Sequence, residues 1–177
     1  MIGLEEKTLE SERLTYRLLR EEDKPVLRAL LSDGAVTEPA GFFPAKSDAE
    51  FDRFFADLTR YDTGVAILRD AEPIGYFHVN RYIPDDEAFA GKTCVGIGIV
   101  IGAAFQGRGF GTEALTFLTA YLLGRFDAVF ADCFAENAAS RRMIEKSGYG
   151  YFDRYTMYFD ELGREETCLS YVVERDR

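Results

Sequence analysis

The sequence holds few of the histidines and cysteines that bind zinc or form disulfides. Its 177 residues include one histidine, His78, and three cysteines with no Cys-x-x-Cys pair among them. Cys94, Cys133 and Cys168 fall in apolar, strand-like stretches, where a buried thiol behaves as a small hydrophobe. A zinc site needs several such ligands at suitable spacing, so we expect no metal.

Long apolar runs and excess basic charge are also lacking. No stretch is long enough to span a bilayer, and the N-terminus has neither the basic nor the apolar part of a signal peptide, so we expect a cytoplasmic protein without a membrane partner. The 21 Lys and Arg against 31 Asp and Glu give a net charge of −10, which argues against nonspecific nucleic-acid binding. This charge would attract a cationic substrate, or it serves solubility alone. The length suits one domain over residues 1–177.

The most informative segment is Gln106–Thr112, which reads Gln-Gly-Arg-Gly-Phe-Gly-Thr. It follows the apolar run Val95–Ile101 and precedes a segment with helical periodicity, Glu113–Phe126. Glycines at alternate positions leave the backbone N–H groups free to converge on an anion, and a helix start behind them adds unpaired N–H groups. The pattern predicts a pyrophosphate site at the end of a strand, and hence a ligand that contains a nucleotide.

Two commoner phosphate loops do not fit. A dinucleotide fingerprint requires a third glycine where Thr112 stands. A Walker loop would end in Gly91-Lys92-Thr93, but Asp86 occupies the position of its first glycine, and the acidic stretch 85–87 would repel a triphosphate. We interpret residues 91–93 as a loop that leads into the next strand.

A second motif lies a strand-length beyond the predicted helix. It reads Asn137-Ala-Ala-Ser-Arg-Arg-Met-Ile-Glu-Lys-Ser-Gly-Tyr149. Together with Gln-x-x-Gly-x-Gly in the first segment, it resembles the acyl-CoA motifs of the GNAT superfamily of N-acetyltransferases. The serine at position 140 and the Glu-Ala-Leu at 113–115 are most similar to the RimJ/RimL-type (ribosomal-protein-alanine acetyltransferase-like) branch.

The order of predicted elements also matches that superfamily, which implies an α/β (α+β) fold. Strands and helices are predicted in the order β-α-α-β-β-β-α-β-α-β-β, with about seven strands and about four helices. The resemblance implies that the strands Cys94–Ile101 and Ala128–Phe134 splay into a V where CoA enters. Gly96 and Gly98 suit such a distortion, because glycine within a strand often marks a bulge or a close approach. The segment 32–46, rich in Gly and Pro, is expected to be irregular.

The resemblance implies acetyl-CoA as cosubstrate and assigns residues to it. The N–H groups after Gln106 would hold the pyrophosphate, with Arg108 as an added cation, and backbone groups of the preceding strand would pair with the pantetheine arm. Asn137 would bind the pantetheine and also cap the helix behind it. The implied cofactor-binding residues are Ile99, Val100, Ile101, Gln106, Gly107, Arg108, Gly109, Phe110, Gly111, Thr112, Asn137 and Ser140.

The catalytic groups are less determined. Many members have a tyrosine seven residues after the asparagine, where this chain has Ile144; Ser140 is then a possible proton donor, and a purely structural hydrogen bond is its competitor. The glutamate that some members use as general base would fall near Gly96, so the base is unknown, with Glu136, His78 or a water chain as options. Cys133 is left out, because direct transfer is the rule in the superfamily.

The acceptor pocket is expected from the loop after the first helix and from one strand. The implied residues are Glu38, Phe42, Phe43, Tyr76 and His78, although the two phenylalanines also suit a loop that covers the core, and a strand histidine is often structural. We expect an N-acetyltransferase acting on a protein N-terminus or a small-molecule amine, as a monomer or homodimer. A catalytically inactive acyl-CoA-binding sensor is the alternative.

Overall fold

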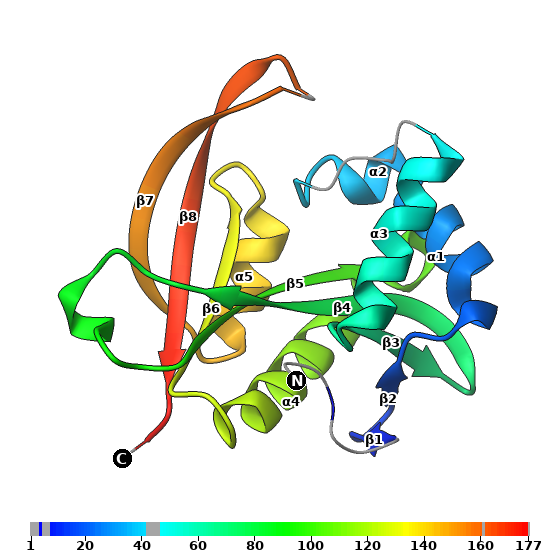
Figure 1. Ribbon diagram of the computed structural model, residues 1–177, viewed down its shortest axis with the longest axis horizontal. Helices are drawn as coiled ribbons and strands as arrows, with labels where there is room; N and C mark the ends of the chain where they lie inside the picture. Colours follow the sequence, from blue (N-terminus) through cyan, green and yellow to red (C-terminus); the bar gives the residue numbers. More distant parts are fainter. Residues whose placement is uncertain (1–3, 5–7, 42–46, 161, 177) are drawn as a thin grey trace.

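The computed structural model describes residues 4, 8–41, 47–160 and 162–176, and within them one mixed sheet has the strand order β1-β2-β3-β4-β5-β6-β8-β7 (Figure 1). The strands are β1 (Leu9–Glu10), β2 (Thr15–Leu18), β3 (Gly64–Arg69), β4 (Glu72–Tyr82), β5 (Cys94–Ile101), β6 (Ala128–Phe134), β7 (Gly150–Phe159) and β8 (Arg164–Glu174). The α-helices are α1 (Lys24–Leu31), α2 (Gly34–Thr37), α3 (Asp48–Arg60), α4 (Phe110–Leu123) and α5 (Ala138–Lys146). All sheet neighbours are antiparallel except β5 and β6.

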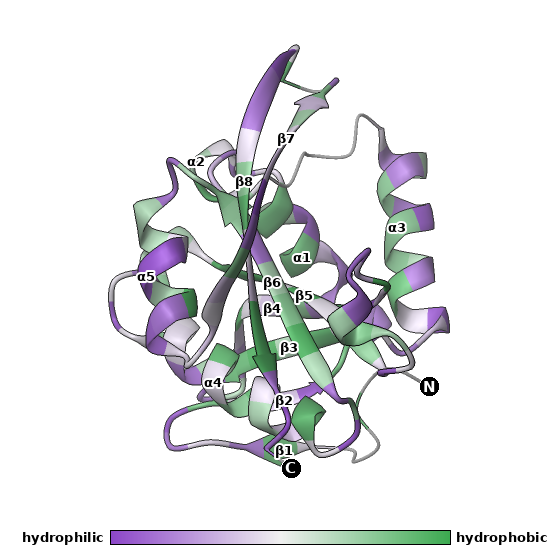
Figure 2. Cartoon of the chain, turned by 90° about the vertical axis from the view of Figure 1, so that its left-hand side faces the viewer, coloured by the Kyte–Doolittle hydropathy of each residue, from purple (hydrophilic) through white to green (hydrophobic). Residues whose placement is uncertain are grey.

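Helices cover both faces of the sheet, as the apolar patterns of the strands require (Figure 2). On one face, Phe110, Leu115 and Leu118 of α4 and Ile144 of α5 pack on the odd-numbered side chains of β5 and β6. On the other face, side chains of α1 and α3 pack on β3 and β4. The α3 helix begins as its sequence predicts, because the Ser47 hydroxyl accepts a hydrogen bond from the Glu50 N–H (3.2 Å).

The predicted splay between β5 and β6 is present. These strands pair in parallel only from Cys94 to Ile97 on β5 and from Ala128 to Ala131 on β6. Beyond these four pairs the strands continue to Ile101 and Phe134 without a ladder between them. The sheet therefore opens after Ile97 and Ala131, at the carboxyl ends of two parallel strands.

Of the two roles expected for the glycines of β5, the structure shows a close approach and no bulge. The register of β4 against β5 is continuous, so neither Gly96 nor Gly98 marks a bulge. A Cβ on Gly98 would lie 2.2 Å from Cε1 of His78, and one on Gly96 would lie 3.3 Å from the Tyr82 ring. Both glycines make room for side chains of the neighbouring strand.

Three further features depart from the sequence prediction. The short strand β1 raises the number of strands to eight, and the helix α2, capped by the Asp33 side chain, lies in the segment expected to be irregular. The α4 helix begins at Phe110 rather than at Glu113, because Gly109 takes the left-handed conformation (φ 81°) and serves as its N-cap. Among the described residues no helix is long and apolar enough to cross a membrane.

The β7–β8 hairpin is a long arm that curves away from the rest of the sheet (Figure 1). Its register is interrupted once, where Tyr151 lies opposite Tyr171 but Asp153 lies opposite Ser170. Phe152 is therefore an extra residue, and such a bulge changes the face on which the following side chains lie.

Candidate active site

The glycine segment forms an open turn whose N–H groups have no backbone acceptor. Within the described chain, none of the six N–H groups from Gly107 to Thr112 makes a backbone hydrogen bond outside the helix itself, and the first bond of α4 is donated by Glu113 to Gly109 (3.0 Å). Gly107 and Gly109 have positive φ angles of 72° and 81°. This conformation and the helix start leave the N–H groups available to a ligand, which suits the anion site that the sequence predicts.

An arginine from the N-terminal segment holds this loop and was not found by sequence reasoning. The Arg13 guanidinium donates to the Arg108 carbonyl (3.1 Å) and forms an ion pair with Glu113 (2.7 Å). Burial alone would raise the pKa of Glu113, but hydrogen bonds from Ser11 and Arg13 outweigh it and lower that pKa. Because Arg13 lies 95 residues from the loop, no local pattern indicates it.

The last glycine and the phenylalanine of the loop serve packing. A Cβ on Gly111 would lie 2.8 Å from the Met143 sulfur, so this glycine lets α4 approach α5. The Phe110 ring is buried, with the Arg13 and Arg69 guanidinium groups 4.6 and 5.0 Å from its centroid. Phe110 and Gly111 were both predicted to bind the ligand, and each has only its backbone N–H group available for this.

The edge of β5 that faces the opening presents alternate backbone groups. Gly102 donates to the Ile74 carbonyl (2.8 Å), which fixes the phase of the antiparallel ladder. Val100 therefore bonds to β4, and its side chain is buried under α1 and α3. Ile99 and Ile101 turn their N–H and C=O groups towards the opening, where the Gln106 side chain occupies the Ile101 carbonyl (2.8 Å).

Asn137 and Ser140 lie at the start of α5, on the other side of the opening. The Asn137 carbonyl oxygen caps the helix by accepting from the Ser140 N–H (3.0 Å), as predicted, and its amide donates to the Pro39 carbonyl. The Ser140 hydroxyl makes no hydrogen bond among the described residues. Ile144, where many relatives of this type have tyrosine, is buried in the core.

The predicted acceptor residues are only partly brought together. The Tyr76 hydroxyl lies 3.1 Å from Nδ1 of His78, whose imidazole lies over Gly98 at the opening of the sheet. Burial lowers the pKa of His78 to about 4, so the imidazole is neutral at physiological pH. Glu38 is exposed after α2, and Phe42 and Phe43 lie outside the described residues.

Register places a carboxylate at the opening that the sequence analysis did not single out. Asp132 is the first residue of β6 beyond the paired segment and lies on the same face as Phe130, the partner of Gly96. Continuing the register sets it across the opening from Gly98 and His78. Asp132 is exposed and accepts a hydrogen bond from the Tyr155 hydroxyl of β7 (3.0 Å). A charged residue within the otherwise apolar strand Ala128–Phe134 was the signal available for it.

The remaining candidate groups contribute less. Glu136 is exposed on the loop before α5. All three cysteines are free and buried, and burial raises the pKa of the Cys133 thiol to about 11. Among the described residues, no three His, Cys, Asp or Glu side chains are placed to hold a metal ion.

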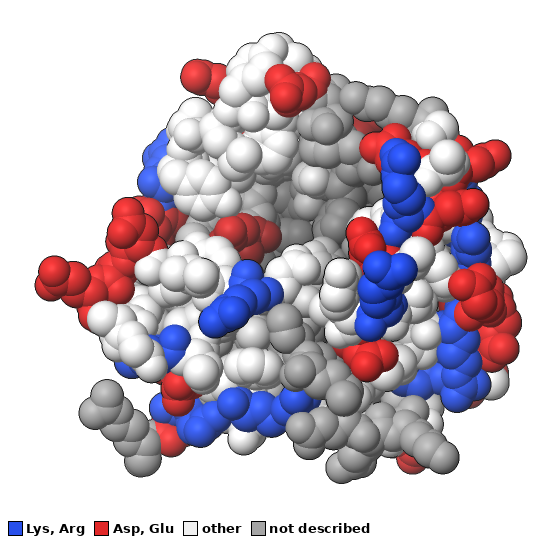
Figure 3. Space-filling model, viewed as in Figure 1, with Lys and Arg blue, Asp and Glu red and all other residues white. Residues whose placement is uncertain are grey.

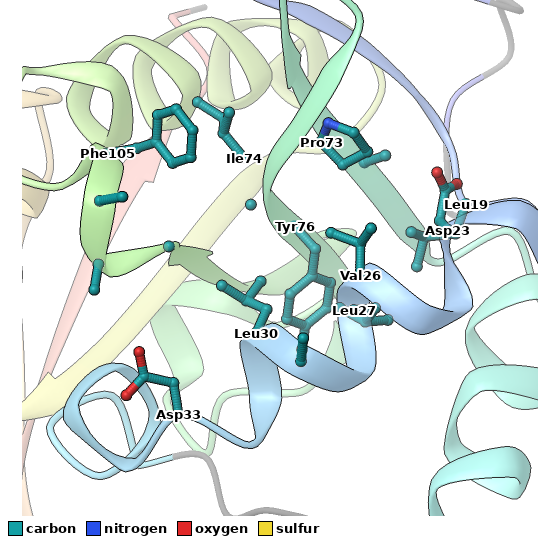
Figure 4. A pocket seen from close by; sticks show the side chains of 16 residues that line it. Leu19, Asp23, Val26, Leu27, Leu30, Asp33, Pro73, Ile74, Tyr76 and Phe105 are labelled. Atoms are coloured by element: carbon teal, nitrogen blue, oxygen red, sulfur yellow. The ribbon is translucent and has the colours of Figure 1, made fainter.

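An apolar pocket of about 380 Å³ lies elsewhere, between α1, the start of β4 and the turn at residues 103–105 (Figure 4). Leu27, Leu30 and Tyr76 form part of its wall. Its two carboxylates are already engaged, since Asp23 pairs with Arg17 (2.6 Å) and Asp33 caps α2. Figure 3 shows the molecular face hollowed between the β7–β8 arm and the side of α2 and α3.

Comparisons with known proteins agree with this geometry. Residues 13–150 match the sequence family described as acetyltransferase (GNAT) domain, and no curated protein matches the chain. A GNAT-family acetyltransferase from Bacillus anthracis superimposes with a TM-score of 0.80, at 16% identity over 96% of this chain and 99% of that one. RimL, a ribosomal alpha-N-protein acetyltransferase solved with coenzyme A, gives 0.79, at 19% identity over 96% and 98%. Spermidine N-acetyltransferase from Vibrio cholerae, solved with CoA and spermine, gives 0.76, at 15% identity over 93% and 97%.

Proposed function

Because the chain belongs to the family of acetyltransferase (GNAT) domains, we propose that it transfers the acetyl group of acetyl-CoA directly to a primary amine. The observation that carries this proposal is the loop of free N–H groups at the start of α4, next to the open edge of β5. An anion site and an unpaired strand edge, side by side, suit a ligand with a pyrophosphate and an amide-containing arm.

The residues present fit acetyl-CoA in named roles. The N–H groups of Gly107 to Thr112 would hold the pyrophosphate, with Arg108 and Arg13 as nearby cations. Ile99 and Ile101 would offer backbone groups to the pantetheine arm, whereas Val100 is turned towards β4. Asn137 would reach the same arm from α5. Acetyl-CoA, when bound, supplies the activated acetyl group.

Transfer requires a neutral amine, a polarised carbonyl and a proton for the departing sulfur. The amine nitrogen forms the new bond to the acetyl carbon as the carbon–sulfur bond breaks. A backbone N–H at Ile99 would polarise the carbonyl oxygen. Asp132, across the opening, would receive the amine proton directly or through one water, and Tyr155 holds its carboxylate in place. This assignment fills the role of general base that the sequence analysis left unknown.

Ser140 would return a proton to the sulfur, because its hydroxyl lies in the first turn of α5 and Ile144 has none to offer. Ser140→Ala tests this step. A loss of turnover with unchanged acetyl-CoA binding supports the donor role, and unchanged turnover removes Ser140 from the mechanism.

Two acceptor classes fit the fold relatives and the sequence. The resemblance to the RimJ/RimL-type branch favours a protein N-terminus, and the structural likeness to a spermidine acetyltransferase favours a small amine. Glu38, Phe42, Phe43, Tyr76 and His78 would line the acceptor pocket, with Asp132 as the addition from the structure. A sensor that binds acyl-CoA without turnover is the second candidate, favoured by Ile144 and Gly96 where relatives have catalytic side chains.

The deciding experiment combines binding with turnover. Thermal unfolding with acetyl-CoA, CoA, NAD and ATP, each supplied separately, should show stabilisation by the first two only. A ligand at 100 times its dissociation constant adds about 2.7 kcal/mol. Thiol release from acetyl-CoA is then followed with a panel of amines and N-terminal peptides. Turnover supports the transferase, whereas binding with no turnover across the panel favours the sensor.

A further inference from the structure

One row of side chains crosses the opening on the face of the sheet that carries His78 and Asp132, which we call the acceptor face. The register places His78 opposite Gly98 on one side of the opening, and Asp132 opposite Ser170 on the other. Ser170 in turn lies opposite Asp153 of β7. Residues paired directly across neighbouring strands lie on the same face, so Asp132, Ser170 and Asp153 form one line.

Asp153 reaches this row only because of the bulge at Phe152. A regular register continued from Tyr151 and Tyr171 would set Phe152 opposite Ser170 and turn Asp153 to the other face. Both carboxylates also lie close enough to Tyr82 to affect its hydroxyl. The pKa of Tyr82 is raised first by burial and further by the charges of Asp132 and Asp153.

Neither carboxylate has a cation within the described chain. Asp132 accepts from the Tyr155 hydroxyl, and Asp153 accepts from the Arg154 N–H (2.7 Å), but the ion pairs of the described residues include neither of them. Two acidic side chains of one sheet row are thus left to solvent without a counter-charge.

The residue between them points to a ligand as well. Ser170 is 1% exposed, and its hydroxyl makes no hydrogen bond of normal length and angle. The Tyr82 hydroxyl is near enough for Ser170 to lower the Tyr82 pKa, but the two do not form such a bond. A buried hydroxyl without a well-formed hydrogen bond is costly, and a donor bound between the two carboxylates would satisfy it by taking the place of the neighbouring Tyr82 hydroxyl.

Resting on the proposed acetyl transfer, we propose that the acceptor carries a second positive group besides the amine that is acetylated. Asp132 faces the reacting amine, and Asp153, with the Ser170 hydroxyl beside it, binds the second group. Two strand spacings separate the backbones of β6 and β7, roughly 9–10 Å. The acceptor class is therefore an amine whose second ammonium or guanidinium lies a few bonds away, rather than a simple monoamine.

The test compares amines that differ only in the second charge. Initial rates of thiol release are measured with butylamine, hexylamine and the terminal diamines of butane and hexane. We expect at least one diamine to exceed its monoamine in kcat/KM roughly tenfold, the scale of one hydrogen-bonded charge. Asp153→Asn should lower the ratio of diamine to monoamine by about the same factor. Asp85→Asn removes an equal charge from the exposed β4–β5 connection and should leave the ratio unchanged.

A ratio near one in the parent protein, or a ratio that Asp153→Asn does not lower, would overturn the inference. Calorimetric titration of diaminohexane into the CoA-saturated protein tests the second binding site without requiring acetyl transfer. Binding that Asp153→Asn weakens supports the inference even if no amine is acetylated, in which case the acetyl transfer alone fails. Absence of binding and of diamine preference together overturn it.

Discussion

The two sides of the opening present different kinds of groups to a ligand. On the β5 side, the groups offered are backbone N–H and C=O groups of residues 99–112, and the side chains there pack, hold the loop or are absent. On the side of β6, β8 and β7, the groups offered are side chains, with Asp132 and Asp153 foremost. The first side suits a ligand shared by a whole family, whereas the second can vary its ligand by substitution without loss of the fold.

Removing the carboxylate at the opening should give the largest effect. Asp132→Asn should lower kcat on the order of 100-fold, because general base catalysis typically contributes this much. Acetyl-CoA binding, measured by thermal unfolding, should be unaffected. The rate of the variant should keep rising with pH, since only amine that is already neutral can react. A variant with the parent rate and pH profile would show that a water chain to solvent suffices.

A side chain at Gly98 should break the acceptor side without touching the loop. Gly98→Ala places a methyl group 2.2 Å from the His78 ring and should cost about 1–3 kcal/mol of unfolding free energy. In a His78→Ala background, the cost of Gly98→Ala in unfolding free energy should be smaller by at least about 1 kcal/mol. Denaturant unfolding of the four proteins measures this coupling. Additive costs would mean that Gly98 is needed for another reason.

A side chain added to the glycine loop should lower both the unfolding free energy and the affinity for CoA. Gly109→Ala forces alanine to φ 81° and should cost about 1 kcal/mol. It should also weaken CoA binding roughly tenfold, since the N–H groups of the loop are displaced. Gly91→Ala is the matched control, because Gly91 has φ 77° with open space around it and lies outside the site. Equal losses of CoA affinity in both variants would count against the loop as anion site.

The smallest effect is expected at Cys133, although its strand borders the opening. Burial raises the pKa of its thiol to about 11, so the nucleophilic thiolate is nearly absent at pH 7. Cys133→Ala should keep kcat and show no acetylated enzyme by mass spectrometry. A strong loss of kcat with intact folding would instead require transfer through the cysteine.

The sequence predicted the β5 side of the opening, which offers backbone groups, better than the β6, β8 and β7 side, which offers side chains. The loop at Gln106–Thr112 and the strands Cys94–Ile101 and Ala128–Phe134 follow from local patterns of glycine and apolar residues, and the structure has both strands at the predicted bounds. Asp132 and Asp153 were missed because pairing between strands places them, and Arg13 was missed because it reaches the loop only through contacts with the distant residues Arg108 and Glu113. The side chain that lies over Gly98 was also missed, since His78 lies 20 positions earlier and only the register shows the contact.

The bulge at Phe152 determines which charged side chains of β7 lie on the same face of the sheet as Asp132. If β7 were paired with β8 without it, Phe152 would take the place of Asp153, and Arg154 would take the place of Tyr155 opposite Cys168. This face would then present a phenylalanine in place of the acid Asp153 and a base in place of Tyr155. A shift of one residue in the pairing of β7 would thus remove one acid from the wall that meets the acceptor and add one base, while the loop that meets the cosubstrate stayed as it is.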